Sequence, residues 1–231
     1  MQRLGRWLKR ATLGLIAFLL LYQFWLFGWV LWWNWVNPDT TRFMEIRLGE
    51  LQAKDPQAQL KKQWVGYEKI SPHLKRAIVA SEDAKFVDHE GFDWEGIQKA
   101  IEKNQKKGRV VAGGSTISQQ LAKNLFLSPS KTPWRKAEEA LITLMLEAVW
   151  SKQRILEVYL NVIEWGNGVF GAEAAARHYY GSAASQLSPE QAARLAGMVP
   201  NPRFYDRNRG APGLARKAGV ILARMPSAEL P

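Results

Sequence analysis

The chain has 231 residues, of which 47% are hydrophobic, and it carries a formal net charge of +11 at neutral pH. This length allows one domain with a substantial core beside an anchoring segment, but two full domains would be cramped. Because the chain contains no cysteine, disulfide frameworks, thiol nucleophiles and cysteine-ligated metal sites are excluded.

An uncharged apolar stretch covers residues 11–36 and is long enough to cross a bilayer. Basic residues fill the tail 1–10, which places the N-terminus in the cytoplasm and the rest of the chain on the other side of the membrane. A cleaved signal peptide is the alternative, but its apolar part is usually shorter and ends in small residues. This stretch ends in tryptophans, which favour the headgroup zone of a membrane. We therefore expect a retained single-pass anchor.

Most of the positive charge lies beyond the N-terminal tail. Nucleic acid is the usual partner of a basic domain. A domain held outside the cytoplasm is better matched to a lipid bilayer with anionic headgroups or to a phosphorylated lipid, so we expect no nucleic acid partner. A generally solvated basic surface explains many of these lysines equally well.

Residues 37–63 are polar and predict a helical stalk with a break near Asp55-Pro56, and residues 64–231 then form the domain. Within it, residues 63–70 show weak alternation, which predicts a short extended piece. Helix starts share one pattern, in which a hydroxyl residue can cap the helix and proline takes the first helical position. The three starts are Ser71-Pro72, Thr132-Pro133 and Ser188-Pro189.

Apolar residues at helical spacing follow each start and predict the buried faces. The expected core positions are Leu74, Ala77 and Ile78, then Ala137, Leu141, Leu144 and Ala148, then Ala192, Leu195 and Val199. Another helix begins at Ser151, and one more is predicted over 169–180, ended by Gly181 in a left-handed cap. Residues 106–114 are predicted to form a mobile loop. The domain is therefore mainly α.

The block from Glu82 to Gly91 offers a carboxylate among aromatic and histidine residues. Glu82 is predicted near the end of its helix, with Phe86 one turn later. An apolar neighbour and the nearby Asp83 would raise the pKa of Glu82 and make it a useful base. Asp83 is expected to bond loop amides before His89. A solvated surface glutamate is the ordinary alternative for Glu82.

A second block runs from Gly114 to Asn124 and is rich in hydrogen-bond donors. Ser115 or Thr116 can cap its helix, whose free first amides would attract an anion. One helix face carries Gln120 and Asn124, and the neighbouring face carries Gln119 and Lys123. We expect this block to contact substrate, because an ordinary surface helix would carry mixtures of glutamate and lysine.

A third block brings Arg135 and Lys136 close to Glu139. The simplest interpretation is a helix ion pair between Arg135 and Glu139, which contributes little to stability. However, Glu139 leads directly into the apolar run 140–146. A carboxylate at the edge of that run, beside two cations, is well placed to line a cleft.

These blocks, together with Lys152-x-x-Ile155-Leu156-Glu157-x-Tyr159-Leu160-Asn161 and the glycines that follow, resemble the peptidoglycan glycosyltransferases of family 51. The resemblance covers about residues 64–202. Tyr180 and Ser182 stand where the family pattern has Phe and Lys. The resemblance implies a mainly α fold, with a lysozyme-like helical lobe and a small membrane-facing jaw, preceded by one N-terminal transmembrane helix.

The resemblance also implies a reaction. Glu82 would be the general base that takes a proton from the sugar 4-hydroxyl of lipid II. That oxygen would attack the anomeric carbon of the growing glycan chain, form a β-1,4 linkage and release undecaprenyl diphosphate. Lipid II, the growing chain and the bilayer are thus the implied partners, with cell-wall synthesis or division proteins as candidates. The implied location is the inner (plasma) membrane, with the catalytic domain in the periplasm.

By the same resemblance, Glu139 is the second catalytic carboxylate and the ligand of a divalent cation, Mg²⁺ or Mn²⁺. Lys123, Lys131, Arg135 and Lys136 are the cations that would neutralise the diphosphate. The implied substrate-binding residues are Asp83, Phe86, His89, Ser115, Thr116, Gln119, Gln120, Lys123, Asn124, Arg135 and Lys136. The run Leu125-Phe126-Leu127 is expected to help the jaw dip into lipid.

Two alternatives remain open from the sequence. A lysozyme-like glycan hydrolase also uses two carboxylates, and a membrane-anchored cell-wall scaffold would need neither. Ser128 to Lys131 also spells Ser-x-x-Lys, the nucleophile pattern of penicillin-binding domains. Only 100 residues follow it, so we expect no transpeptidase activity.

Overall fold

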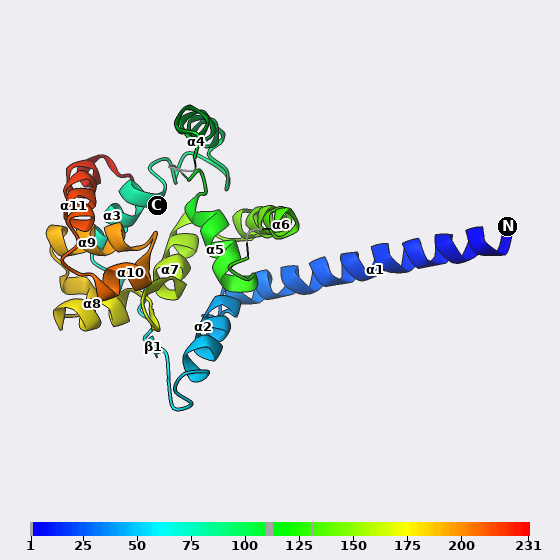
Figure 1. The fold of residues 1–231 in the computed structure, drawn as a ribbon, viewed down its shortest axis with the longest axis horizontal. Coiled ribbons are helices and arrows are strands. Elements are labelled where there is room, and N and C mark those ends of the chain that lie inside the picture. Colours follow the sequence, from blue (N-terminus) through cyan, green and yellow to red (C-terminus); the bar gives the residue numbers. More distant parts are fainter. Residues whose placement is uncertain (1, 110–112, 131) are drawn as a thin grey trace. The chain divides into compact units, whose positions relative to one another are not determined.

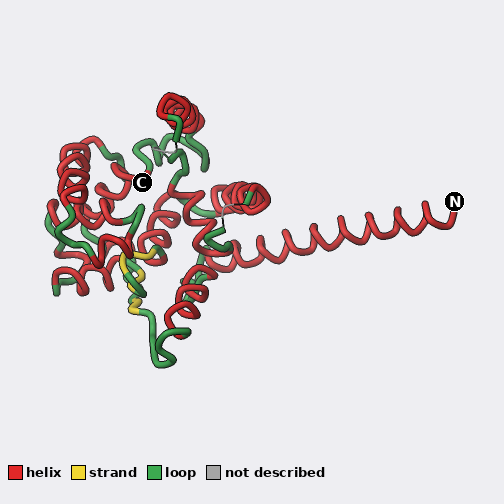
Figure 2. Tube along the Cα trace, in the orientation of Figure 1, coloured by secondary structure: helices red, strands yellow, loops and turns green. Residues whose placement is uncertain are grey.

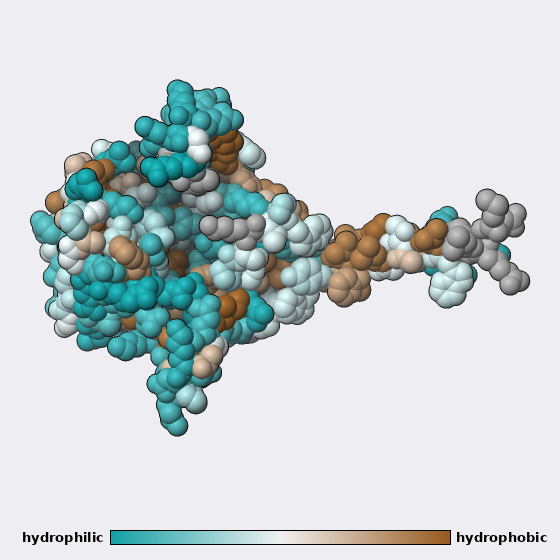
Figure 3. Space-filling model, in the orientation of Figure 1, coloured by the Kyte–Doolittle hydropathy of each residue, from teal (hydrophilic) through white to brown (hydrophobic). Residues whose placement is uncertain are grey.

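Helices dominate the computed structural model, which describes residues 2–109, 113–130 and 132–231 (Figure 2). The chain divides into two compact units, Met1–Pro38 and Asp39–Pro231. The first unit contains α1 (Gln2–Trp33), and its segment Arg6–Trp33 is long and apolar enough to cross a membrane. Figure 3 shows apolar side chains gathered along this helix. The mainly α fold is confirmed.

The second unit is built from two groups of packed helices (Figure 1). In the first group, α3 (Pro72–Glu82), α9 (Pro189–Met198) and α11 (Pro212–Arg224) pack against one another. In the second group, α5 (Ile117–Phe126) packs against three helices, which are α2 (Arg42–Gln52), α6 (Pro133–Val149) and α7 (Lys152–Val162). The remaining helices are α4 (Trp94–Lys107), α8 (Ala172–Tyr180) and α10 (Pro202–Arg207).

A small sheet lies beside α8 and α10. Its strand order is β1 (Lys61–Lys62), β3 (Val169–Phe170), β2 (Glu164–Gly166), with β1 parallel and β2 antiparallel to β3. The helix predicted over 169–180 is therefore wrong in its first residues. Gly171, at φ 84°, separates β3 from α8 because its left-handed backbone conformation is one that most other residues avoid. Gly181 ends α8 in the predicted left-handed cap.

The predicted helix caps are confirmed. The hydroxyls of Ser71, Thr132 and Ser188 each accept a hydrogen bond from a backbone amide in the first turn of α3, α6 and α9, respectively. Ser151 caps α7 in the same way. Each cap satisfies an amide that the helix itself leaves without a partner, which typically contributes about 1 kcal/mol.

Other local predictions need correction or lie outside the described residues. Residues 63–66 are not in a strand, and a short 3-10 helix, Tyr67–Lys69, follows them. The predicted mobile loop 106–114 begins inside α4, whose cap is Gly108, and its residues 110–112 lie outside the described part of the chain. Of the predicted stalk 37–63, residues 39–63 group with the second unit and contain α2 (Arg42–Gln52), and the boundary of the stalk stays a prediction.

The buried face of α6 is the reverse of the predicted one. Ala137, Leu141, Leu144 and Ala148 are exposed, as is Trp134, whereas the buried residues are Glu138, Glu139, Ile142, Thr143 and Leu146. Apolar periodicity alone did not predict the buried face, because α6 carries apolar residues on two faces. The face that is buried also contains the polar residues Glu138, Glu139 and Thr143. The exposed apolar row of Trp134, Ala137, Leu141, Leu144 and Ala148 is called the α6 stripe below.

The run Leu125-Phe126-Leu127 does not form an exposed apolar tip. Leu125 and Leu127 are buried, and Phe126 is only partly accessible. Both leucines belong to the core between α5 and its neighbours. The prediction that this run dips into lipid is therefore wrong for the two leucines.

Candidate active site

Glu82 is the last residue of α3, and its carboxylate lies deep but stays partly accessible. The Gln120 side-chain amide donates to one carboxylate oxygen at 2.9 Å, and the Ser81 hydroxyl donates to the other at 3.1 Å. Gln120 is itself held by the hydroxyl of buried Tyr159, which donates to its side-chain oxygen at 2.9 Å. Three elements, α3, α5 and α7, thus fix one carboxylate.

Burial raises the pKa of Glu82 above its ordinary value, while the hydrogen bonds from Gln120 and Ser81 and the charges of Lys217 and Lys123 lower it. The raised pKa agrees with the sequence analysis, but the cause differs. Because α3 ends at Glu82 and the backbone of Asp83 is not helical (φ −162°, ψ 76°), Phe86 does not lie one helical turn beyond Glu82 as predicted. Desolvation by the whole surrounding fold replaces the expected effect of a single apolar neighbour.

Asp83 joins the first block to the second. One of its carboxylate oxygens bonds His89 Nε2 at 2.9 Å, and the other accepts the backbone amide of Ile117 at 2.9 Å. Asp83 is buried, so both contacts are shielded from water. The prediction that Asp83 bonds loop amides before His89 is wrong, because its partners are the Ile117 amide of α5 and the His89 ring.

The first turn of α5 is already satisfied by protein groups. Thr116 and Gln119 form a reciprocal capping box, and Asp83 occupies the amide of Ile117. Thr116 and Gln119 are both buried. The backbone amides of Thr116, Ile117 and Gln119, which were predicted to be free to bind an anion, therefore already donate to protein side chains.

Phe86 and His89 also lie behind the site. Phe86 is fully buried, and the Lys152 ammonium lies 4.8 Å from the centre of its ring. Lys152 pairs in addition with Glu147 at 2.8 Å, and Glu147 accepts from the Ser118 hydroxyl. These largely buried contacts tie the segment after Asp83 to α5, α6 and α7, behind the carboxylate of Glu82.

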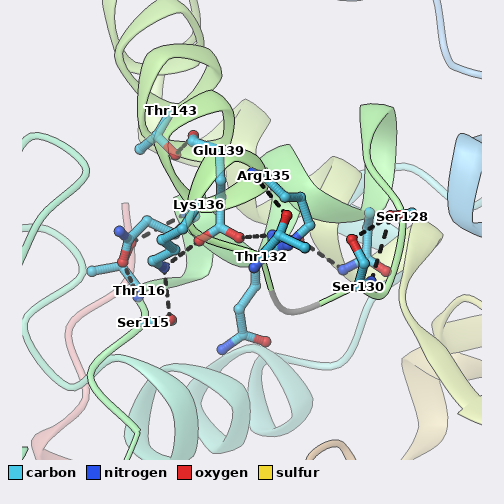
Figure 4. Close-up of polar contacts among 12 residues, drawn as sticks. Ser115, Thr116, Ser128, Ser130, Thr132, Arg135, Lys136, Glu139 and Thr143 are labelled. Carbon is cyan, nitrogen blue, oxygen red and sulfur yellow. Dashed lines mark hydrogen bonds and ion pairs between the residues drawn. The ribbon is translucent and has the colours of Figure 1, made fainter.

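A second carboxylate, Glu139, lies in the second turn of α6 and is paired with two cations (Figure 4). Arg135 donates to one of its oxygens and Lys136 to the other. Lys136 also reaches the Ser115 hydroxyl at 3.2 Å, and Thr143 donates to the Glu139 backbone oxygen at 2.7 Å. The predicted pair of Arg135 with Glu139 is confirmed, and it is buried on the carboxylate side.

Lys123 connects the two carboxylates electrostatically. Burial lowers its pKa, the charges of Glu139 and Glu82 raise it, and those of Arg135 and Lys136 lower it. Within the described ranges its ammonium makes no hydrogen bond or ion pair. Asn124 instead donates to the backbone oxygen of Gln120 at 2.7 Å. Lys123 is thus a largely buried cation with bonding capacity to spare, which suits an anionic ligand group. Lys131, also predicted as a cation of the site, lies outside the described residues.

Two hollows open beside these groups. The larger, of about 550 Å³, is lined by Glu82 and Ser81 together with Tyr205 and the α11 cations Arg216, Lys217 and Arg224. The smaller, of about 240 Å³, is lined by Gln120, Lys123 and Asn124 of α5 together with Arg47, Glu164 and Arg203.

Lys217 and Glu164 also line these hollows, although they belong to none of the recognised sequence blocks. Lys217 is brought to Glu82 only by the packing of α11 against α3 and α9, and Glu164 reaches the smaller hollow from β2. Lys217 is one of many basic residues in the chain, so the sequence near it gives no sign that it lies beside Glu82.

A divalent cation such as Mg²⁺ needs several oxygen ligands, and the site offers few. Among the described residues there is no group of three histidine, aspartate or glutamate side chains that could hold an ion. Both oxygens of Glu139 already accept from cations. Protein side chains alone therefore do not fit a resident Mg²⁺ or Mn²⁺, which prefers several oxygen ligands.

The chain matches the family described as Transglycosylase over residues 49–226. It therefore belongs to the transglycosylase family and is an enzyme. The match covers both carboxylates, the cations around Glu139 and the α11 residues that line the larger hollow.

Similar proteins span the whole chain. A protein of Dechloromonas aromatica (strain RCB) is 76% identical over 231 residues, which is 100% of both chains. A protein of Nitrosospira multiformis is 65% identical over 226 residues, 98% of each chain, and one of Azoarcus sp. (strain BH72) is 65% identical over 231 residues, 100% of each. All three are named biosynthetic peptidoglycan transglycosylase.

Proposed function

We propose that this enzyme polymerises lipid II into the β-1,4 glycan strands of peptidoglycan and releases undecaprenyl diphosphate. The observation that carries the proposal is the pairing of one partly accessible carboxylate, Glu82, with a separate set of cations around Glu139 and Lys123. The first group suits proton transfer, and the second suits a phosphorylated leaving group. The names of the similar proteins agree with this substrate class.

In the proposed reaction, Glu82 accepts the proton of the 4-hydroxyl on the incoming sugar. The freed oxygen forms a bond to the anomeric carbon of the growing chain, and the bond from that carbon to the diphosphate breaks. The electron pair of that bond leaves with the diphosphate. Because the leaving group is already a weak base once its charge is neutralised, no strong general acid is required, and Lys123 and Arg135 supply the neutralising charge.

The glycan hydrolase alternative is weakened by the state of the second carboxylate. Hydrolysis by two carboxyl groups needs the second one as an acid, a nucleophile or a base for water. Glu139 is buried and bonded to Arg135 and Lys136, so it is engaged in charge pairing. A scaffold without catalysis gives no reason for burying Glu82, Lys123 and Glu139 together. Transpeptidase activity is not expected for this chain.

Anchoring in the inner membrane, with the domain in the periplasm, is part of the proposal. It is supported by the apolar segment Arg6–Trp33 and by the basic residues that precede it. We further propose that the α6 stripe faces the bilayer as the membrane-facing jaw, because Trp134, Leu141 and Leu144 are exposed apolar residues. Tryptophan is suited to the headgroup zone.

A divalent cation remains a prediction. Mg²⁺ commonly binds through one or two carboxylates together with substrate phosphates. If such an ion enters with the diphosphate, Glu139 is the carboxylate that could bind it beside the cations. The ion would then compete with Arg135 and Lys136, which already donate to the two oxygens of Glu139. No step above depends on such an ion.

The proposed function is tested by supplying the purified full chain with lipid II in detergent or vesicles. Glycan polymer and free undecaprenyl diphosphate are the expected products, without peptide cross-links. Loss of preformed glycan polymer without consumption of lipid II would instead identify a hydrolase.

Replacing Lys123 with alanine should lower kcat/KM on lipid II by about 10²-fold, in line with the loss of one preorganised charge at a leaving group. Thermal stability should hardly change, since the ammonium leaves no described partner unpaired and alanine favours the helix. The control is Lys99→Ala, which removes an exposed helix lysine and should leave kinetics within twofold. Unchanged kinetics for Lys123→Ala would remove this residue from diphosphate binding.

The membrane orientation gives a separate prediction. Alkaline phosphatase fused after Pro231 should be active in cells, because this reporter folds only outside the cytoplasm, whereas a cytoplasmic reporter at the same place should be inactive. The basic N-terminal tail is the physical reason, since positive residues stay on the cytoplasmic side. The reverse pattern of the two reporters would overturn the orientation.

A further inference from the structure

The larger hollow carries three cations that the proposed reaction does not use. Arg216, Lys217 and Arg224 line it from α11, where their spacing places them on one side of the helix. They are called the α11 cations below. Among the described residues that line this hollow, Glu82 is the only acidic one. Three positive charges thus share the hollow with a single carboxylate, which the reaction must leave free to take up a proton.

The α11 cations lack the partners that other basic residues of the domain have. All three are exposed. In the described ranges neither Arg216 nor Arg224 makes a hydrogen bond or ion pair, and the ammonium of Lys217 only faces the Tyr205 ring, 5.4 Å from its centre. Most other arginines of the second unit bond a carboxylate or a backbone oxygen. Cations with free donors that gather in one hollow suit an anionic ligand.

Helix packing fixes the α11 cations beside the base. A Cβ atom added at Gly197 of α9 would lie 3.1 Å from Leu214 Cδ1 and 3.5 Å from Lys217 Cβ, so α9 and α11 are in close contact there. α9 also packs against α3, whose last residue is Glu82. The cations and the base therefore belong to one packed group of helices. A ligand group bound on α11 would lie beside the sugar that Glu82 deprotonates.

The α11 cations are separate from those that neutralise the diphosphate. Lys123, Arg135 and Lys136 lie on α5 and α6 in the other helix group, and Figure 1 shows α11 and α6 on opposite sides of α5 and α7. The α6 stripe is the part of the domain proposed to face the bilayer. A lipid-linked diphosphate stays at the bilayer, so an anion bound by α11 belongs to a part of the substrate farther from the lipid.

We propose that α11 binds the peptide that the glycan substrate carries, with Arg216, Lys217 and Arg224 contacting its carboxylates. The sugars of lipid II are uncharged, and apart from the diphosphate its negative charges are the peptide carboxylates. Arginine and lysine bind carboxylates through charge-assisted hydrogen bonds. The hollow of about 550 Å³ lies within the roughly 300–1,000 Å³ of sites that enclose a small ligand. The inference rests on the proposed function, because it takes peptide-bearing lipid II as the substrate.

The test measures the Kd for lipid II in detergent micelles, in a Glu82→Gln background in which substrate is hardly consumed. Arg216→Gln/Lys217→Gln/Arg224→Gln should raise the Kd about tenfold, as three exposed ion pairs of modest strength would together. The difference should shrink at high salt, because exposed charges are screened. Thermal unfolding should hardly change, since all three residues are exposed.

A lipid II analogue whose peptide carboxylates are converted to amides identifies the group that is bound. It should bind the chain with intact α11 cations about tenfold more weakly than lipid II does. The triple variant should add no further loss, because both changes remove the same contacts. The matched control is Lys54→Gln/Lys61→Gln/Lys69→Gln, which removes three charges from exposed residues outside this hollow. It should leave the Kd for lipid II within twofold.

Two results would overturn the proposal. One is an unchanged Kd for lipid II in the triple variant. The other is an equal rise for lipid II and for the amide analogue, which would assign the α11 cations to the diphosphate. Failure of the wild-type chain to polymerise lipid II would count against the proposed function, whereas polymerisation together with an unaltered Kd in the triple variant would count against this inference alone.

Discussion

Glu82→Gln should lower the rate of lipid II polymerisation by about 10²- to 10⁴-fold, the usual effect of removing a general base. The amide keeps the volume of the carboxylate and can still accept from Gln120 and donate to Ser81, which now contact Glu82 at 2.9 and 3.1 Å. It cannot accept the hydroxyl proton. Binding of lipid II should therefore persist, and the loss should appear in kcat, measured as the initial rate at saturating substrate.

The pH dependence gives this prediction a second readout. Burial raises the pKa of Glu82 above its ordinary value. Because a base must be deprotonated to act, activity should fall as the pH drops through that raised pKa. The acid limb of the rate profile should thus lie above the ordinary glutamate value of 4.5, and the residual activity of Glu82→Gln should lack it.

Glu90→Gln is the matched control, since Glu90 lies in the same block but is exposed, and it should retain nearly full activity. If Glu82→Gln polymerises lipid II within a few-fold of wild type, the assignment of the base is wrong. The neighbouring Asp83 would be the next candidate in sequence, but its two oxygens are engaged by His89 and Ile117 in a buried position. A different proton acceptor would then have to be sought along the larger hollow.

Features of this site that depend on nearby residues were predicted from the sequence better than the environment of each side chain. Helix starts in which a serine or threonine precedes a proline have a local physical cause, the unsatisfied first amides of a helix. They were predicted correctly at Ser71, Thr132 and Ser188. The pair of Arg135 with Glu139 also follows from helical spacing. Such features depend on residues only a few positions apart.

Features that depend on distant packing were not predictable in this way. Thr116, Gln119 and Phe86 were expected to touch substrate, yet all three are buried, and Thr116 and Gln119 bond each other at the start of α5. Lys217 and Glu164 reach the two hollows only through the docking of α11 and β2. The inverted face of α6 has the same origin, because the buried side of α6 carries Glu139 near the charge of Lys123, which leaves apolar residues outside.

Glu139→Gln should be nearly as damaging as Glu82→Gln, for a different reason. Glu139 is buried and takes one hydrogen bond from Arg135 and one from Lys136. The amide removes the negative charge and leaves the cations uncompensated. Breaking such a buried pair typically costs about 3–5 kcal/mol, although Lys136 is half exposed and its share is screened by solvent. We expect a loss of about 10²- to 10³-fold in kcat/KM, a higher KM and a lower unfolding temperature.

The kinetic signature separates the two carboxylates. Glu139→Gln keeps Glu82 and should keep the acid limb of the wild-type profile, whereas Glu82→Gln should lose it. Glu95→Gln is the control, because Glu95 pairs with Lys99 four residues away just as Glu139 pairs with Arg135, but on an exposed surface. It should keep activity within twofold. The double variant Glu139→Gln/Arg135→Gln restores the charge balance, and we expect it to recover stability without recovering rate. Recovery of both would mean that Glu139 only neutralises Arg135 and has no part in orienting the diphosphate.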